Sequence, residues 1–290
     1  MRNPLTSLPR ISQYFRRCFL AKDTIAPLFL SLTIGCIGVL NPSPVSAQGT
    51  MAHSPMILTK SQIDAPAELK KLVREIDAAA NKKDLKSLMK FYSQNFTHSD
   101  GLNRETMEKA LSQFWQRYTT LNYTTKIKSW KADGQAFIVE TETQITGTQT
   151  AENRGMTLKS TIRSQQRFES KKIVKQEILA ERNLITSGKN PPTIEINLPE
   201  EVKVGEEYNF DAIVQEPIGN DVLIGTAMEE VIGEKTLLGA STIELELLNS
   251  GGLFKIGKAP ETPENRWVSA ILMRQGGITV ITQRLRVVPQ

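Results

Sequence analysis

The chain has 290 residues and a formal net charge of +5 at neutral pH. Five basic residues and one acidic residue lie in the first 47 positions, which leaves 31 basic and 30 acidic side chains, a net of +1, in the remainder. This near-neutral balance gives no electrostatic basis for a nucleic-acid partner, and the remaining length is sufficient for two packed domains.

Residues 1–47 have the pattern of an export signal. A basic start precedes an apolar run, Ile25–Leu40, which has the length of a signal-peptide core and is too short to favour a spanning helix. Val45-Ser46-Ala47 fits the small-x-small cleavage rule, so the mature chain is expected to start near Gln48 without a stable membrane span. Arg16-Arg17 resembles a twin-arginine motif, so both this route and the ordinary secretory (Sec) route remain open.

Two alternatives to simple cleavage also remain: an uncleaved membrane anchor, and lipidation at Cys36. If the signal is cleaved, Cys18 and Cys36 leave with it, and the mature protein has neither a disulfide nor a thiol nucleophile. Residues 48–64 lack regularly spaced large apolar side chains and are predicted to be a flexible lead-in.

Helical periodicity follows this lead-in. One apolar stripe predicts a helix over Glu68–Ala80. Apolar residues at helical spacing after Asp84, a candidate N-cap, predict a second helix that reaches Tyr92. A third stripe from Met107 to Tyr118 has Asn103 as its candidate cap.

Four strands are expected after the helices. Three are predicted over Thr124–Trp130, Ala136–Thr146 and Ile173–Arg182. Between the last two, Met156–Phe168 alternates so cleanly that one face must pack inward while the other faces water. Gly147–Gly155 is expected to be an exposed loop.

The order of these elements resembles that of the NTF2-like superfamily, including its SnoaL-like and ketosteroid-isomerase-like branches. The resemblance covers residues 65–185 and depends on "DLKSLMKFYSQNF" and "HSDGLNRETMEKALSQFWQRY" preceding several long strands. It implies an α+β domain over residues 65–186, in which helices pack on a curved antiparallel sheet and leave a cone-shaped pocket. It also implies a homodimer through the outer face of the sheet. That face would present Thr157, Lys159, Thr161, Arg163, Gln165 and Arg167.

Residues 187–192 are rich in Gly and Pro and are predicted to be a linker. Short β-rich runs over residues 193–290, separated by turn residues, predict an all-β sandwich. Its opening run, "PPTIEINLPEEVKVGEEYNFDAIV", resembles an immunoglobulin-like domain, and "RWVSAILMRQGGITVITQRLRVV" is predicted to form its closing hairpin.

Charge divides between the two predicted domains. Residues 65–187 have 21 basic and 14 acidic side chains, a net of +7, and residues 188–290 have 9 basic and 15 acidic side chains, a net of −6. The difference is consistent with electrostatic docking of one domain on the other or on a neighbouring copy, and equally with two independently solvated surfaces, because single surface ion pairs stabilise little.

Few residues are suited to catalysis. The chain has two histidines, His53 and His98, so neither a metal nor another cofactor is expected. His98 and Asp100 are the candidates for proton transfer, the chemistry that the resemblance implies for a pocket of this kind. The ketosteroid-isomerase pattern of one Tyr and two Asp residues is not reproduced at matching positions.

The leading hypothesis is an exported two-domain binding protein whose pocket takes a small apolar molecule. The side chains expected to line this pocket are Tyr92, Phe96, His98, Trp115 and Tyr118. One alternative is an isomerase- or dehydratase-type enzyme that uses acid–base residues in the same pocket. A second is a structural envelope protein, whose pocket would be filled by its own aromatic side chains.

Overall fold

The structure is a computed structural model that describes residues 64–151, 154–233, 236 and 243–290. The predicted export signal and most of the lead-in lie outside these residues. Within the described part, no helix has both the length and the apolar character needed to cross a membrane.

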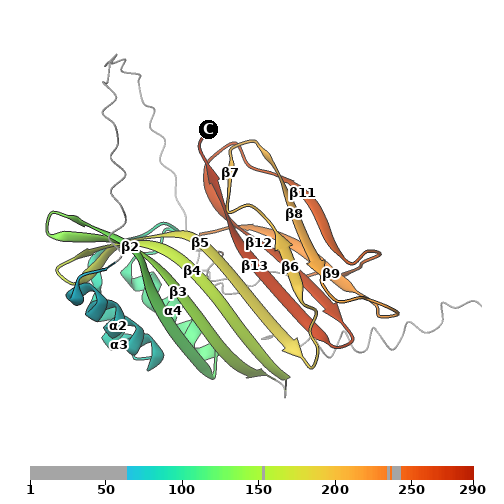
Figure 1. Cartoon of the computed structure of the whole chain (residues 1–290), viewed down its shortest axis with the longest axis horizontal. Coiled ribbons are helices and arrows are strands. Elements are labelled where there is room, and N and C mark those ends of the chain that lie inside the picture. The colour runs from blue at the N-terminus through green and yellow to red at the C-terminus, as the bar shows by residue number, and fades with distance from the viewer. Residues whose placement is uncertain (1–63, 152–153, 234–235, 237–242) are drawn as a thin grey trace, which may run out of the picture.

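The expected first and third helices are both present. Helix α2 (Ala67–Asn81) buries one apolar stripe (Figure 1). Helix α4 (Arg104–Arg117) starts with a capping box: the Asn103 side chain accepts a hydrogen bond from the backbone N–H of Thr106 at 3.0 Å, and the Thr106 hydroxyl accepts one from the backbone N–H of Asn103 at 2.9 Å. These reciprocal bonds satisfy two donors that a helix start leaves open.

The second expected helix is much shorter than predicted. Helix α3 (Leu85–Leu88) is capped by Asp84 as expected, but it passes into a 3-10 turn, η2 (Met89–Phe91). The chain then extends as strand β1 (Tyr92–His98), which pairs in parallel with strand β5 (Lys172–Gly188). The prediction that the helix reaches Tyr92 was therefore wrong, because pairing with a distant strand outweighs the local helical spacing.

The long strands form an antiparallel meander. Strands β2 (Thr120–Asp133), β3 (Ala136–Ala151), β4 (Arg154–Glu169) and β5 are neighbours in that order. The prediction of an exposed loop over Gly147–Gly155 was wrong. Strands β3 and β4 stay paired as far as Ala151 opposite Arg154. Threonines are frequent at the end of β3, and their branched side chains favour extended backbone.

The C-terminal half adds two groups of strands. Strands β6 (Ile194–Asn197), β8 (Glu207–Val214) and β11 (Gly252–Lys258) form a separate three-stranded sheet in the order β11-β8-β6. The others join the first sheet, whose order is β10-β9-β12-β13-β5-β4-β3-β2, with β7 paired to β13. These others are β7 (Glu201–Lys203), β9 (Ile224–Val231), β10 (Glu246–Leu247), β12 (Glu264–Arg274) and β13 (Gly277–Val288).

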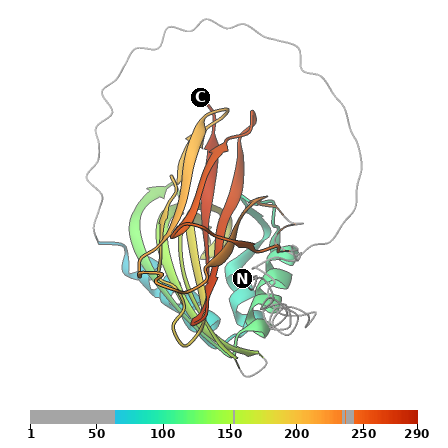
Figure 2. The same cartoon turned by 90° about the vertical axis from the view of Figure 1, so that its right-hand side faces the viewer.

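One sheet therefore runs through both halves of the chain. Strand β13 pairs with β5 from Gly277 opposite Gly188 to Gln283 opposite Arg182. Strand β5 thus extends into the segment predicted as a linker, residues 187–192. Figure 2 shows the orange and red C-terminal strands extending away from the N-terminal helices and strands. The expected closing hairpin is present as β12 and β13, whereas the immunoglobulin-like likeness is not confirmed.

The two faces of the β12–β13 hairpin meet different layers. Ala270 and Leu285 belong to the core shared with Phe210 of the three-stranded sheet. Their neighbours Trp267 and Arg284 face the other way, toward the helices of the N-terminal half. The hairpin is therefore part of the sandwich on one face and part of the helix-covered region on the other.

Ion pairs between the halves only partly follow the charge difference. Arg163 of the basic half bonds Glu200 of the acidic half at 3.0 Å, as docking predicts. The buried contact runs the opposite way, because Arg284 of the acidic half bonds Asp100 of the basic half at 2.8 Å. Net charge therefore does not predict which side chains join the two halves.

Candidate functional site

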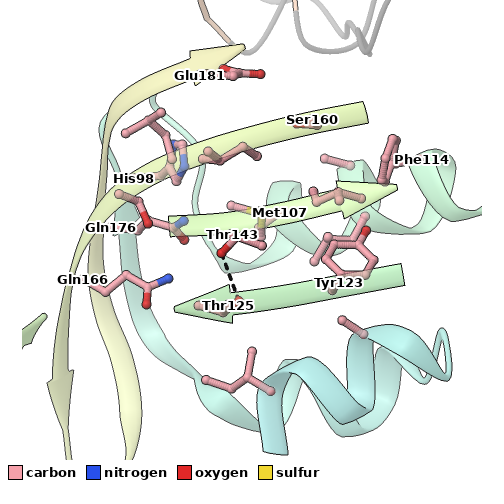
Figure 3. Close-up of a pocket in the computed structure, with 18 of the residues that line it drawn as sticks. His98, Met107, Phe114, Tyr123, Thr125, Thr143, Ser160, Gln166, Gln176 and Glu181 are labelled. Carbon is pink, nitrogen blue, oxygen red and sulfur yellow. Dashed lines mark hydrogen bonds between the residues drawn. The ribbon is translucent and has the colours of Figure 1, made fainter. Parts of the chain in front are cut away.

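A cavity of about 260 Å³ lies between helices α2 and α4 and the inner face of the sheet. Much of its wall is apolar, and Figure 3 shows these side chains converging from helices and strands. Among the apolar residues are Val73, Ile76, Ala80, Met107, Ala110, Leu111, Phe114, Ile145 and Ile162. A concave apolar space with few polar groups is typical of small-molecule sites.

The aromatic residues expected in the pocket divide into two groups. Tyr92 and Trp115 line the cavity. Phe96 and Tyr118 do not; both are buried in the hydrophobic core, where Phe96 packs edge-on against Tyr92 at a ring distance of 4.9 Å. Phe96 packs against Tyr92 and Tyr118 packs against Phe114, so both stabilise side chains that line the cavity.

His98, the last residue of β1, lies at the polar end of the cavity with a side chain only 5% exposed. Its Nδ1 accepts a hydrogen bond from the backbone N–H of Asp100 at 3.1 Å. Burial lowers the pKa of His98 and Arg284 lowers it further, while Asp100 and Glu181 act in the opposite sense. The ring is therefore neutral at pH 7, with its proton on Nε2, and Nε2 is a hydrogen-bond donor.

Asp100 is held by Arg284, a residue 184 positions later in the chain. The two guanidinium nitrogens Nη1 and Nη2 donate to the two carboxylate oxygens at 2.9 and 2.8 Å, with both residues buried. Burial alone would raise the pKa of Asp100, but the hydrogen bonds and charge of Arg284 outweigh it and lower the pKa. Asp100 is therefore an ionised partner in a bidentate pair.

Glu181 on β5 completes the charged cluster. Its carboxylate accepts from Arg284 at 3.1 Å, from the Trp267 indole at 3.0 Å and from the Asn183 amide at 2.8 Å. Trp267 and Arg284 are direct cross-strand partners on β12 and β13. The C-terminal hairpin thus supplies part of the wall of a cavity whose other residues come from the N-terminal half.

A third carboxylate lies at the opposite side of the cavity, on helix α2. Asp77 accepts from the backbone N–H of Thr125 at 2.8 Å and from its hydroxyl at 2.6 Å. Each carboxylate in the described lining is therefore held by donors of the protein itself.

Two buried acceptors in the lining have no protein partner. The side-chain oxygens of Asn183 and Gln176 are buried without a hydrogen bond. The amide nitrogen of Asn183 donates to Glu181 at 2.8 Å, which leaves the buried Oδ1 without a hydrogen-bond partner. Buried polar groups normally find a partner, so these two acceptors are exceptions within the described lining.

Sequence reasoning missed Arg284, Trp267 and Glu181. The alternation of β13 shows that Arg284 lies on the face opposite Leu285, but it does not show what that face meets. Of the described residues, no group of three or more His, Cys, Asp or Glu side chains is placed to hold a metal ion.

Comparison with known protein families gives a match over part of the chain. Residues 189–288 match a family described as a domain of unknown function (DUF8623). No curated protein matches the chain. The matched segment is about a third of the chain and includes both Trp267 and Arg284.

Solved structures resemble about two fifths of the chain. Bd1075 of Bdellovibrio bacteriovorus is 16% identical over 38% of each chain, with a TM-score of 0.30, so this chain spans well under half of its length. AclR, a putative hydroxylase from Streptomyces galilaeus, is 22% identical over 39% of this chain and 87% of its own, with a TM-score of 0.32. A putative SnoaL-like polyketide cyclase from Shewanella putrefaciens is 11% identical over 40% and 90%, with a TM-score of 0.31. Similarity of this degree says nothing of activity.

Proposed function

We propose that the cavity binds a small, largely apolar molecule and does not perform acid–base catalysis on it. The observation that carries this proposal is that each described carboxylate of the lining is already engaged: Asp77 by Thr125, and Asp100 and Glu181 by Arg284. A general base needs a free lone pair within reach of the proton that it removes. The protein's own donors occupy these carboxylates instead.

The other titratable residues of the lining also favour binding. His98 uses Nδ1 to accept a backbone hydrogen bond, which leaves it a donor at Nε2. Burial raises the pKa of Tyr92 to about 12, so its phenol stays protonated at neutral pH. Neutral donors of this kind orient a ligand, and they are weak proton acceptors.

The proposed binding function also depends on a proposed fold. Residues 65–186 form an NTF2-like cone, and the β12–β13 hairpin closes one side of it through Trp267 and Arg284. An isomerase- or dehydratase-type enzyme is the rival, and engagement of the carboxylates counts against it. A purely structural envelope protein would have a filled pocket, and a cavity of about 260 Å³ counts against that. Export and pairing of two copies through the outer sheet face remain proposals from the sequence.

Binding can be tested with the neutral apolar fluorophore N-phenyl-1-naphthylamine, whose emission rises in apolar surroundings. The native protein is expected to bind it saturably. Ala110→Trp places an indole in the cavity and is expected to abolish binding. The matched control is Gln116→Trp, which adds an indole at an exposed position of the same helix and is expected to leave binding intact.

Circular dichroism of both variants separates loss of the cavity from loss of the fold. Equal binding by a folded Ala110→Trp variant and the native protein would place the fluorophore elsewhere and refute the proposal. Absence of saturable binding to the native protein would refute it directly.

A further inference from the structure

The three-stranded sheet has an open edge at β11. This strand is the last of its sheet, and β8 is its one partner among the described strands. The backbone N–H of Val214 donates to the carbonyl of Gly251 at 2.9 Å, and the backbone N–H of Ala259 donates to the carbonyl of Glu206 at 2.8 Å. Hydrogen-bonded and non-hydrogen-bonded positions alternate along an antiparallel pair. The even-numbered residues of β11 therefore direct their backbone groups away from β8, toward the open edge.

The side chains at this edge are apolar and exposed. Phe254 is 55% exposed and Ile256 is 75% exposed, and both belong to the even-numbered set. Lys255 between them is also exposed and has no salt-bridge partner in the described part of the chain. An apolar edge with free backbone groups is a template on which another strand can pair.

Strand β10 forms a second open edge with the complementary pattern. It ends the larger sheet and pairs with β9, where the backbone N–H of Leu248 donates to the carbonyl of Leu223 at 2.9 Å. Leu247, one residue earlier, therefore directs its backbone groups outward, and its side chain is 64% exposed. Glu246 is exposed and has no salt-bridge partner among the described residues. Residues 248–251 connect β10 to β11, so the two edges are close together in the molecule.

We propose that the protein forms a two-fold symmetric dimer in which β11 of each copy pairs, antiparallel, with β10 of the other. In the register that joins the free backbone groups, Phe254 lies opposite Leu247 of the second copy. Lys255 then lies opposite the second copy's Glu246. Apolar pairs and opposite-charge pairs across neighbouring strands stabilise a sheet. Because each contact occurs twice about the two-fold axis, the assembly closes at two copies.

Charge favours β10 over a second β11 as the occupant of this edge. Pairing of β11 with another β11 in the register that matches Phe254 to Ile256 would place Lys255 opposite Lys255, and like charges directly opposite each other are destabilising. The proposed surface also differs from the outer face of the N-terminal sheet, through which the sequence predicts a dimer. It goes beyond the proposed binding function, because neither strand contributes a residue to the described lining of the cavity.

The test measures self-association by sedimentation-velocity ultracentrifugation over a range of protein concentrations. The native protein is expected to show a monomer–dimer equilibrium. Lys255→Glu and Glu246→Lys are each expected to weaken dimerisation by at least about tenfold, because each change places like charges opposite each other at both symmetric contacts. An equimolar mixture of the two variants is expected to dimerise as the native protein does, since opposite charges then face each other at both contacts.

Two matched controls carry the same changes of charge elsewhere. Lys159 lies on β4 of the N-terminal sheet, and Glu195 lies on β6, at the opposite edge of the three-stranded sheet; both are exposed. Lys159→Glu and Glu195→Lys are each expected to dimerise as the native protein does, and their mixture is expected to associate no more tightly. Circular dichroism checks that every variant is folded.

Three outcomes would overturn the proposal. A native protein that stays monomeric up to about 1 mM would refute the dimer. Loss of dimerisation in Lys159→Glu but not in Lys255→Glu would assign the dimer to the outer face of the N-terminal sheet. A mixture that fails to restore dimerisation would refute the pairing of Lys255 with Glu246. None of these measurements uses the fluorophore, so the dimer and the binding function are tested separately.

Discussion

The buried contact between Arg284 and Asp100 allows a quantitative test of what holds the halves of the chain together. In Arg284→Leu, three hydrogen bonds at 2.8, 2.9 and 3.1 Å are lost, and the buried Asp100 and the half-buried Glu181 are left without a cation. Removing one partner of a buried ion pair costs about 3–5 kcal/mol. A domain typically has about 5–15 kcal/mol of unfolding free energy, so the loss is a large part of the total.

The assay is urea unfolding at pH 7, followed by circular dichroism, with Arg286→Leu as the matched control. Arg286 lies two residues further along β13 and pairs near the surface with Glu201 and Glu177. Its replacement is expected to cost about 0–1 kcal/mol. If Arg284→Leu costs no more than Arg286→Leu, the reasoning is refuted.

The same comparison has a pH dependence of known sign. Arg284 keeps the pKa of Asp100 below its ordinary value of 3.8 in the folded protein, against the effect of burial. This stabilisation is complete above the unfolded value and is lost as the pH falls through the folded pKa. The difference in unfolding free energy between the native protein and Arg284→Leu is therefore expected to shrink as the pH falls below 3.8; a difference that stays constant there would contradict the assignment.

Three further predictions concern single sites. Burial lowers the pKa of His98 below 6.5, so the native protein is expected to lose stability as the pH falls below that value, and His98→Gln is expected to flatten this slope between pH 6.5 and 5 in urea titrations. An unchanged slope would mean that His98 is not the group responsible. Asn103→Ala removes the capping box of α4 and is expected to cost about 1 kcal/mol by urea unfolding, and no cost would show that the cap is dispensable. Asp77→Ala leaves the backbone N–H of Thr125 without its acceptor and is expected to cost about 1–3 kcal/mol in the same assay; a neutral result would mean that water replaces the carboxylate.

Features set by nearby residues could be predicted from the sequence. Asp84 and Asn103 start their helices as expected, because a cap bonds to backbone groups two or three positions away. The alternation of β4 correctly separates Leu158 and Phe168, which are buried, from Gln165, which is exposed. Period and capping are local properties, and one sequence is enough to find them.

Features set by distant residues could not be predicted in this way. Tyr92 has helical spacing with its predecessors, yet it lies in a strand because β5 offers a backbone partner opposite Ile173. Phe96 and Tyr118 were expected in the pocket with Tyr92, and only packing decides which aromatic ring faces the free space. The partner of Asp100 lies 184 positions away, and no local pattern connects the two.

The shared sheet also limits how the molecule can move. Backbone hydrogen bonds join β5 to β4 on one side and to β13 on the other, so the halves cannot swing apart on a hinge without breaking a ladder of such bonds. The sheet, which includes the β12–β13 hairpin, is therefore the rigid part of the molecule. The helices contact it mainly through side chains, so any movement that accompanies binding is expected in α2 or α4 and not in the strands.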